Sequence, residues 1–261
     1  MQPEVKRLSY SEIDKTFQNR KDIISETYAS KIDVFQDIIE LSFHLARVLN
    51  ARFNEEYEAT GKKMTGAEAL IPILFERNNH YLIAVHELGL IGLSNPSYLN
   101  LRAIFEGITQ IYLLHLTDKE ADLFYKDQLE RLNASEKKEL RRDYNWLSQA
   151  KVRDILYSGT KKDDLKKLYS VLSNSTHPSV KGAMGDFTLK HNVVIDILDV
   201  SLILSVANLI AINESYFEKI NEEEMDDIGE ALDKVAKELN NEMREMIPNN
   251  PAVIEKLKIK F

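Results

Sequence analysis

The chain has 261 residues, of which 44% are hydrophobic and 29% charged, a composition typical of a globular protein. It contains no cysteine, which excludes disulfides, thiolate metal sites, iron–sulfur clusters and a cysteine nucleophile. The formal net charge of −8 argues against broad attraction to nucleic-acid phosphates, because that attraction needs clustered Lys and Arg. The N-terminus has no apolar segment of signal-peptide length, so we expect a cytoplasmic protein.

Helical periodicity begins near the N-terminus, where residues 1–28 are expected to form a helical arm. From Ile32 to Tyr57, apolar residues recur along one side of a helix, and Gly61 supplies a stop. The motif Thr65-x-x-Glu68 is typical of a capping box and predicts a helix start. Pro72 then predicts either a kink in that helix or a later start.

A central helix is predicted between Asn95 and Leu116. Asn95 is expected to cap it, with Pro96 in its first turn. The segment is apolar nearly all round, which indicates a helix enclosed by others. A further capping box is predicted at Asn133, and another helix is predicted from about residue 162 to 176.

Two helices are predicted in the last third of the chain. A long buried helix is expected from His191 to about Tyr216, and an acidic helix is expected to start at Asn221. The apolar run of the first, Val200 to Ile212, is shorter than the ~20 residues that cross a bilayer, so we expect no membrane partner.

No segment alternates polar and apolar residues as a strand does, so the predicted class is all-α. We expect a single multi-helix bundle with long central helices and a peripheral acidic C-terminal helical segment. The predicted domain spans 1–261, with the arm at 1–28, a core bundle at 29–216 and a C-terminal appendage at 217–261.

The familiar catalytic and cofactor motifs are absent, and we predict no cofactor and no metal. Two pairs, Glu40 with His44 and Glu76 with His80, have a spacing that can chelate a metal. Such pairs also arise as ordinary contacts on a helix surface, which is the interpretation we favour.

Polar residues on two predicted helices suggest a site. Arg102, Glu106 and Thr109 form a polar stripe on the apolar central helix, while Tyr169, Ser173 and His177 are spaced by four along a later one. If these edges face each other, a polar cluster forms inside the bundle. It would be either a satisfied structural network or a site.

His177 is the histidine with the strongest case for a function. It is predicted at the C-terminus of a helix, where the helix dipole raises the pKa of an imidazole. It also enters the glycine-containing segment 177–186, which includes Lys181 and is either a functional loop or a plain connector. We therefore predict His177, Arg102 and Glu106 as catalytic residues and Tyr169, Ser173 and Lys181 as ligand-binding residues.

The pattern Arg102-x-x-x-Glu106 followed by Tyr169-x-x-x-Ser173-x-x-x-His177 resembles an uncharacterised family of prokaryotic all-helical proteins. More distantly it resembles the HEPN superfamily of helical bundles, many of which are defence or toxin ribonucleases. The resemblance covers about residues 95–185. It implies a helical bundle, commonly dimeric, with a polar site near the histidine.

HEPN ribonucleases carry an arginine four to six residues before the catalytic histidine. Here Leu172 and Ser173 precede His177 at such spacings, so ribonuclease activity of this kind would require Arg102 to reach the histidine from its own helix.

Two functions follow from these observations. The first is a non-catalytic helical interaction protein, self-associating or bound to a protein partner, in a prokaryotic defence or regulatory system. The alternative is a HEPN-like ribonuclease or another phosphate-directed enzyme, in which His177 moves protons and Arg102 holds RNA or a phosphate ligand.

Overall fold

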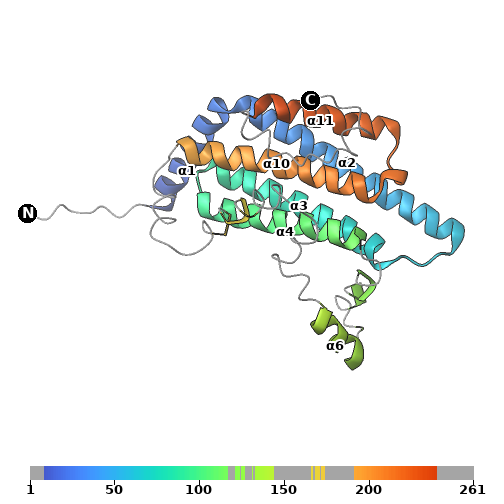
Figure 1. The fold of residues 1–261 in the computed structure, drawn as a ribbon. Coiled ribbons are helices and arrows are strands. Elements are labelled where there is room, and N and C mark those ends of the chain that lie inside the picture. The colour runs from blue at the N-terminus through green and yellow to red at the C-terminus, as the bar shows by residue number, and fades with distance from the viewer. Residues whose placement is uncertain are drawn as a thin grey trace, which may run out of the picture.

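The structure is a computed structural model that describes residues 9–116, 121–123, 125–126, 131, 133–143, 166, 168–170, 172–173 and 191–239. Every regular element in these ranges is a helix and none is a strand, which confirms the all-α prediction (Figure 1). The elements are α1 (Tyr10–Thr27), α2 (Ala29–Thr60), α3 (Gly66–Leu90), α4 (Ser94–Leu116), α6 (Ala134–Asp143), α10 (His191–Ser215), η2 (Phe217–Lys219) and α11 (Glu222–Glu238).

Local signals fix the boundary between α2 and α3. Gly61 ends α2 in the left-handed conformation, with φ of 64°. The capping box is formed as predicted, because the Glu68 amide donates to Thr65 Oγ1 at 3.2 Å and the Thr65 amide donates to Glu68 Oε2 at 2.8 Å. The later start is wrong, since α3 begins at Gly66 and contains Pro72.

The predicted cap of α4 is also wrong. The helix begins at Ser94, because the carbonyl of Leu93 already accepts the Ser97 amide at 3.3 Å and so closes the first turn before Asn95. Asn95 therefore lies inside the helix. The starts predicted from Asn133 and Asn221 are confirmed by their side-chain caps.

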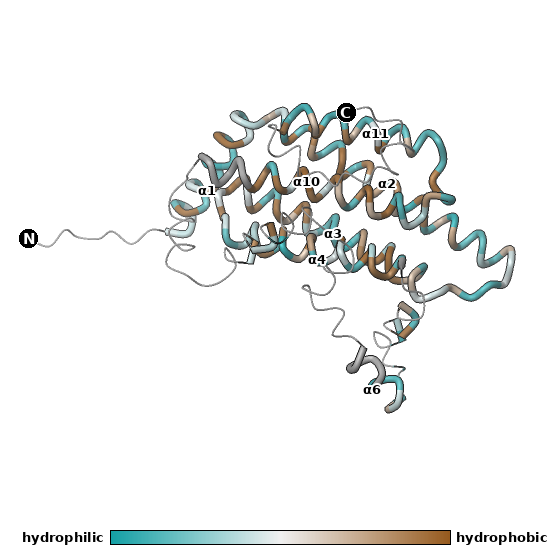
Figure 2. Tube along the Cα trace, in the orientation of Figure 1, coloured by the Kyte–Doolittle hydropathy of each residue, from teal (hydrophilic) through white to brown (hydrophobic). Residues whose placement is uncertain are grey.

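The core lies where α3, α4 and α10 pack against one another, with α2 and α11 packed beside them. Residues 197–213 of α10 are buried without exception, and hydrophobic colour runs along this helix in Figure 2. The segment Ile197–Ser215 is long and apolar enough to cross a membrane, but 94% of it is buried inside the bundle. Its apolar surface is thus covered by the neighbouring helices.

The acidic helix α11 is amphipathic. Ile228, Leu232 and Val235 join the main core, while the charged residues of its first turn include an exposed Glu222. Arg52 of α2 holds the start of α11 through two hydrogen bonds of 2.7 Å to the Glu224 carboxylate. How the chain divides into an arm, a core and an appendage stays a prediction.

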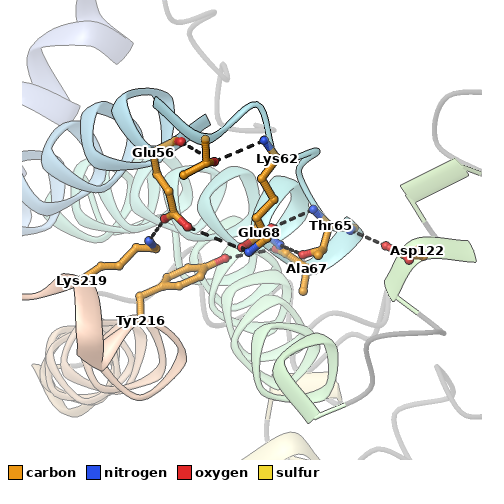
Figure 3. A network of polar contacts seen from close by, with 10 residues as sticks. Glu56, Lys62, Thr65, Ala67, Glu68, Asp122, Tyr216 and Lys219 are labelled. Atoms are coloured by element: carbon orange, nitrogen blue, oxygen red, sulfur yellow. Dashed lines mark hydrogen bonds and ion pairs between the residues drawn. The ribbon is translucent and has the colours of Figure 1, made fainter. Parts of the chain in front are cut away.

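A network of polar contacts ties α2, α3 and η2 together at one end of the bundle (Figure 3). Glu56 of α2 pairs with Lys219 of η2, and Lys62 lies 3.6 Å from Glu68 of α3. The Tyr216 hydroxyl donates to a backbone carbonyl in the first turn of α3 at 3.1 Å. The Glu56–Lys219 pair and the Tyr216 hydrogen bond link segments more than 140 residues apart, so they fix how the helices meet.

Gly66, the first residue of α3, is in close contact with residues Ala121 and Asp122, which follow α4 in the chain. Its amide donates to Asp122 Oδ1 at 2.6 Å (Figure 3). A Cβ at this position would lie 2.3 Å from the Ala121 carbonyl oxygen, a distance that no side chain tolerates. The sequence therefore needs glycine here to let the two backbones approach.

Candidate functional site

The two predicted polar edges meet in the structure. On α4, Arg102 Nε donates to Glu106 Oε1 at 2.9 Å. Arg102 Nη2 donates to the Tyr169 hydroxyl at 3.0 Å, and that hydroxyl donates to the same Glu106 oxygen at 3.1 Å. Three side chains thus form a closed triangle that joins α4 to the helical residues 168–170.

Aromatic packing holds the triangle in place. The Tyr169 ring lies 5.9 Å from the Phe105 ring, and the Arg102 guanidinium lies 5.2 Å from the Tyr169 centroid. A guanidinium over an aromatic face is attracted by the ring quadrupole. The side chains of Arg102 and Glu106 are 31% and 29% exposed, so the triangle reaches solvent.

The hydrogen bond to Glu106 raises the pKa of Arg102 above its usual value, and the Tyr169 oxygen acts in the same direction. Arg102 is therefore a fixed cation, held through Nε and Nη2. Among the described residues nothing accepts a hydrogen bond from its Nη1.

A second arginine reaches the same part of α4 from α3. Burial lowers the pKa of Arg77, while the nearby Tyr81 and Glu106 favour its charged form. Its guanidinium lies 5.9 Å from the Tyr81 centroid. Its Nε is buried and makes no hydrogen bond within the part of the chain that the structure describes.

Gly107 makes room for Arg77. A Cβ at residue 107 would lie 2.6 Å from Arg77 Nη2 and 2.1 Å from Asn78 Oδ1. The guanidinium of Arg77 therefore rests directly against the α4 backbone beside Glu106. We call the set Arg77, Arg102, Glu106, Gly107 and Tyr169 the two-arginine site.

The remaining predicted site residues have different positions. Ser173 lies in the same described helical stretch as Tyr169, with its hydroxyl buried. Thr109 is buried, and its hydroxyl donates to the Glu106 carbonyl at 2.8 Å rather than to the Glu106 carboxylate. His177 and Lys181 lie outside the described residues, so their roles stay predictions.

Sequence reasoning missed Arg77 and Gly107. A signal was present, because Arg77, Asn78 and Asn79 lie in a run of five polar residues, Glu76 to His80, in the middle of a largely apolar helix. Asn78 and Asn79 are fully buried. The contact of this run with Gly107 depends on how α3 crosses α4, so the spacing of residues along the sequence does not predict it.

The described residues contain no group of three or more His, Asp or Glu side chains arranged to hold a metal ion. Glu40, His44, Glu76 and His80 of the two chelating pairs are exposed on helix surfaces.

The charge of the two-arginine site is unbalanced. The site holds two guanidinium groups, of which Arg102 is paired with Glu106 and Arg77 makes no ion pair among the described residues, so it carries one net positive charge in a chain whose net charge is −8. Arginine side chains match the geometry of phosphate and carboxylate groups, which they bind through parallel N–H donors. An arrangement of this kind suits an oxyanion. No family model, curated protein or solved structure matches this chain.

Proposed function

We propose that this chain is a non-catalytic helical binding protein that takes a phosphate-bearing anion at the two-arginine site. The observation that carries the proposal is that two arginines lie near the single carboxylate of Glu106: Arg102 is hydrogen-bonded to it, and Arg77 is close enough for the charge of that carboxylate to act on the Arg77 pKa. One unit of positive charge is left for a ligand.

The surroundings of Arg77 support a ligand more strongly than those of Arg102. A partly buried cation without a hydrogen bond is costly, because burial removes the water that would otherwise solvate it. An oxyanion at the guanidinium would supply the opposite charge and an acceptor for its Nη groups, which are not among the buried unpaired atoms. Arg102, already fixed by Glu106 and Tyr169, would offer its Nη1 edge to the same anion.

The fixed state of Arg102 favours binding over catalysis. Its Nε and Nη2 serve Glu106 and Tyr169, so the triangle positions charge and leaves the tyrosine hydroxyl engaged as both donor and acceptor. The enzyme alternative depends on His177, which follows Tyr169 by eight residues. Incubating the protein with labelled RNA separates the two: wild-type cleavage that is lost in His177→Ala would replace the binding proposal with the ribonuclease.

The direct test is thermal unfolding in inorganic phosphate against chloride at matched ionic strength, with isothermal titration of phosphate alongside. A ligand at ten times its Kd stabilises the folded state by about 1.4 kcal/mol, which raises Tm by about 3–5 °C for a domain of this size. Arg77→Gln is expected to fold, since it removes a partly buried cation that has no ion-pair partner among the described residues, and to lose the phosphate response.

Arg47→Gln is the matched control, because Arg47 is an exposed arginine on α2. It should respond to phosphate as the wild type does. Equal phosphate responses in wild type and Arg77→Gln would overturn the proposal. Self-association and a place in a defence system stay predictions from the resemblance.

A further inference from the structure

The N-terminal helix α1 is attached to the bundle by few contacts. Ile24 is its single buried residue among those described. Ile24 belongs to a small cluster, separate from the main core, with Ile32 of α2, Leu90 of α3 and Leu198 of α10. Tyr28 alone separates α1 from α2 and has φ of −120° and ψ of 28°, outside the helical region. The helix therefore has a one-residue joint at which it can change direction.

A buried histidine lies next to this attachment. His86 of α3 is 6% exposed, and its ring stacks on the Phe35 ring of α2 with centroids 4.7 Å apart and planes 2° from parallel. These two residues lie one turn from Leu90 and Ile32, so the stacked pair adjoins the cluster that holds Ile24. His86 Nε2 is buried with no hydrogen-bond partner among the described residues.

One ion pair joins α1 to α3 at the same place. Lys21 Nζ lies 2.7 Å from Glu87 Oε2, while the other oxygen of Glu87 lies 3.9 Å from His86 Nδ1. Glu87 and Lys21 are also the two charged groups that act on His86 electrostatically.

The flanking helices α2 and α10 bring Lys31 and Asp199 to this end of the bundle. These two side chains are 2.5 Å apart and neutralise each other. The charge balance around His86 thus rests on Glu87 and Lys21.

We propose that protonation of His86 at acid pH releases α1 from the bundle. In the neutral form the imidazole fits an apolar slot between Phe35 and the Ile24 cluster. Proton uptake places a cation in that slot with a second N–H, at Nε2, that has no acceptor there. The cation also attracts Glu87 and repels Lys21, which weakens the ion pair that joins α1 to α3. Hydration of the imidazolium then requires the slot to open, and α1 lies beside it through Lys21 and Ile24.

The direction of the pH dependence follows from burial. Burial lowers the pKa of His86 from its ordinary value of 6.5, and the positive charge of Lys21 lowers it further against the opposing effect of Glu87. The open state, in which the imidazole is solvated, titrates near 6.5. Docking of α1 is therefore complete above pH 6.5 and weakens as the pH falls below it.

The absence of cysteine allows the test to use two spin labels. Asn19→Cys on α1 and Glu76→Cys on α3 are both at exposed positions. At pH 7.5 the distance distribution between the labels should be narrow. At pH 5.0 a second, longer and broader population should appear, and it should disappear when the pH is returned to 7.5.

His86→Phe keeps an aromatic ring against Phe35 and cannot take up a proton, so it should retain the narrow distribution at both pH values. His86→Leu serves the same purpose if the phenylalanine variant does not fold. His115→Phe, which changes an exposed histidine on α4, should behave as the wild type.

A second label pair, Glu76→Cys with Asp226→Cys on α11, reports on the rest of the bundle and should not change with pH. The proposal is overturned if the wild type keeps one narrow distance at pH 5.0, or if His86→Phe shows the same transition. It is equally overturned if both label pairs broaden together, because the whole bundle then opens rather than α1.

Discussion

Asn78 of α3 donates a hydrogen bond of 2.9 Å to Asn208 of α10, and both residues are fully buried. The Asn208 amide donates in turn to Asn79 at 3.0 Å. A polar bridge therefore joins the two most apolar helices of the bundle, next to the two-arginine site. These hydrogen bonds form at only one relative position of α3 and α10. Sliding either helix along its axis would leave the buried side-chain amides without these partners.

Asn208→Leu, which preserves side-chain volume, should lower the free energy of unfolding by about 2–5 kcal/mol. It strands the Asn78 donor and the Asn79 acceptor, at about 1–3 kcal/mol for each unsatisfied buried group. Urea denaturation followed by circular dichroism measures the change. Ser205→Ala on the same helix is the control, because the Ser205 hydroxyl bonds only to its own helix backbone. A cost for Asn208→Leu no larger than that of Ser205→Ala would mean that the bridge contributes little.

Gly107→Ala should damage both stability and the phosphate response. The added Cβ meets Asn78 Oδ1 and Arg77 Nη2 at distances that force both side chains to move. Overpacking of this kind costs about 1–3 kcal/mol, which outweighs the gain of up to about 1 kcal/mol in helix propensity. Gly89→Ala is matched, since its Cβ would meet only the Ile197 side chain at 3.2 Å. Thermal unfolding with and without phosphate compares the two variants. An unchanged phosphate response in Gly107→Ala would show that Arg77 does not bind the ligand.

Lys31→Met should destabilise the fold far more than a surface mutation does. Asp199 is 3% exposed and depends on Lys31, which also donates to the Glu238 carbonyl at the end of α11. Removing one partner of a buried ion pair costs about 3–5 kcal/mol, because a charge is left buried alone. The double variant Lys31→Met with Asp199→Leu should recover most of the loss. A double-mutant cycle by urea denaturation measures the coupling free energy between Lys31 and Asp199. Additive effects of the two single substitutions would show that the two residues are not coupled.

Glu224→Gln should lower stability at neutral pH and much less at acid pH. Burial alone would raise the pKa of Glu224, but the Arg52 hydrogen bonds, the Asn221 amide and the charge of Arg52 outweigh it, so the pKa is lowered below the reference value of 4.5. A carboxyl group with a lowered folded-state pKa stabilises the protein fully above its unfolded pKa. That stability is lost as the pH falls through the folded-state pKa.

The wild type and Glu224→Gln should therefore differ at pH 7 and converge below pH 4.5. Urea denaturation at pH 7, 5 and 3 measures the difference. A constant difference across this range would show that the ionised carboxylate is not the source of the effect.

The helix boundaries that sequence predicted correctly rest on contacts within four residues. Thr65 with Glu68 and Asn221 with Glu224 form their caps from local groups, so spacing alone identifies them. The cap predicted at Asn95 was wrong, because the start of a helix depends on which carbonyl closes its first turn. In α4 that carbonyl belongs to Leu93.

Part of the candidate site was also predictable. Helical periodicity placed Arg102 with Glu106 on one edge of α4 and Tyr169 on one edge of a later helix, but whether the two edges face each other was left open. Arg77 was not predictable in the same way. Its contact with Gly107 requires the crossing of α3 over α4 at one register, and many registers satisfy the same apolar pattern.

By itself, the sequence determined the all-helical class, most helix boundaries and the polar edge of α4, because backbone hydrogen bonds, caps and apolar periodicity are local properties. Only the tertiary structure decided that a second arginine, Arg77, lies near Glu106 and that His86 lies next to the attachment of α1. Charge balance and burial depend on neighbours distant in the chain, and these are set when the helices pack.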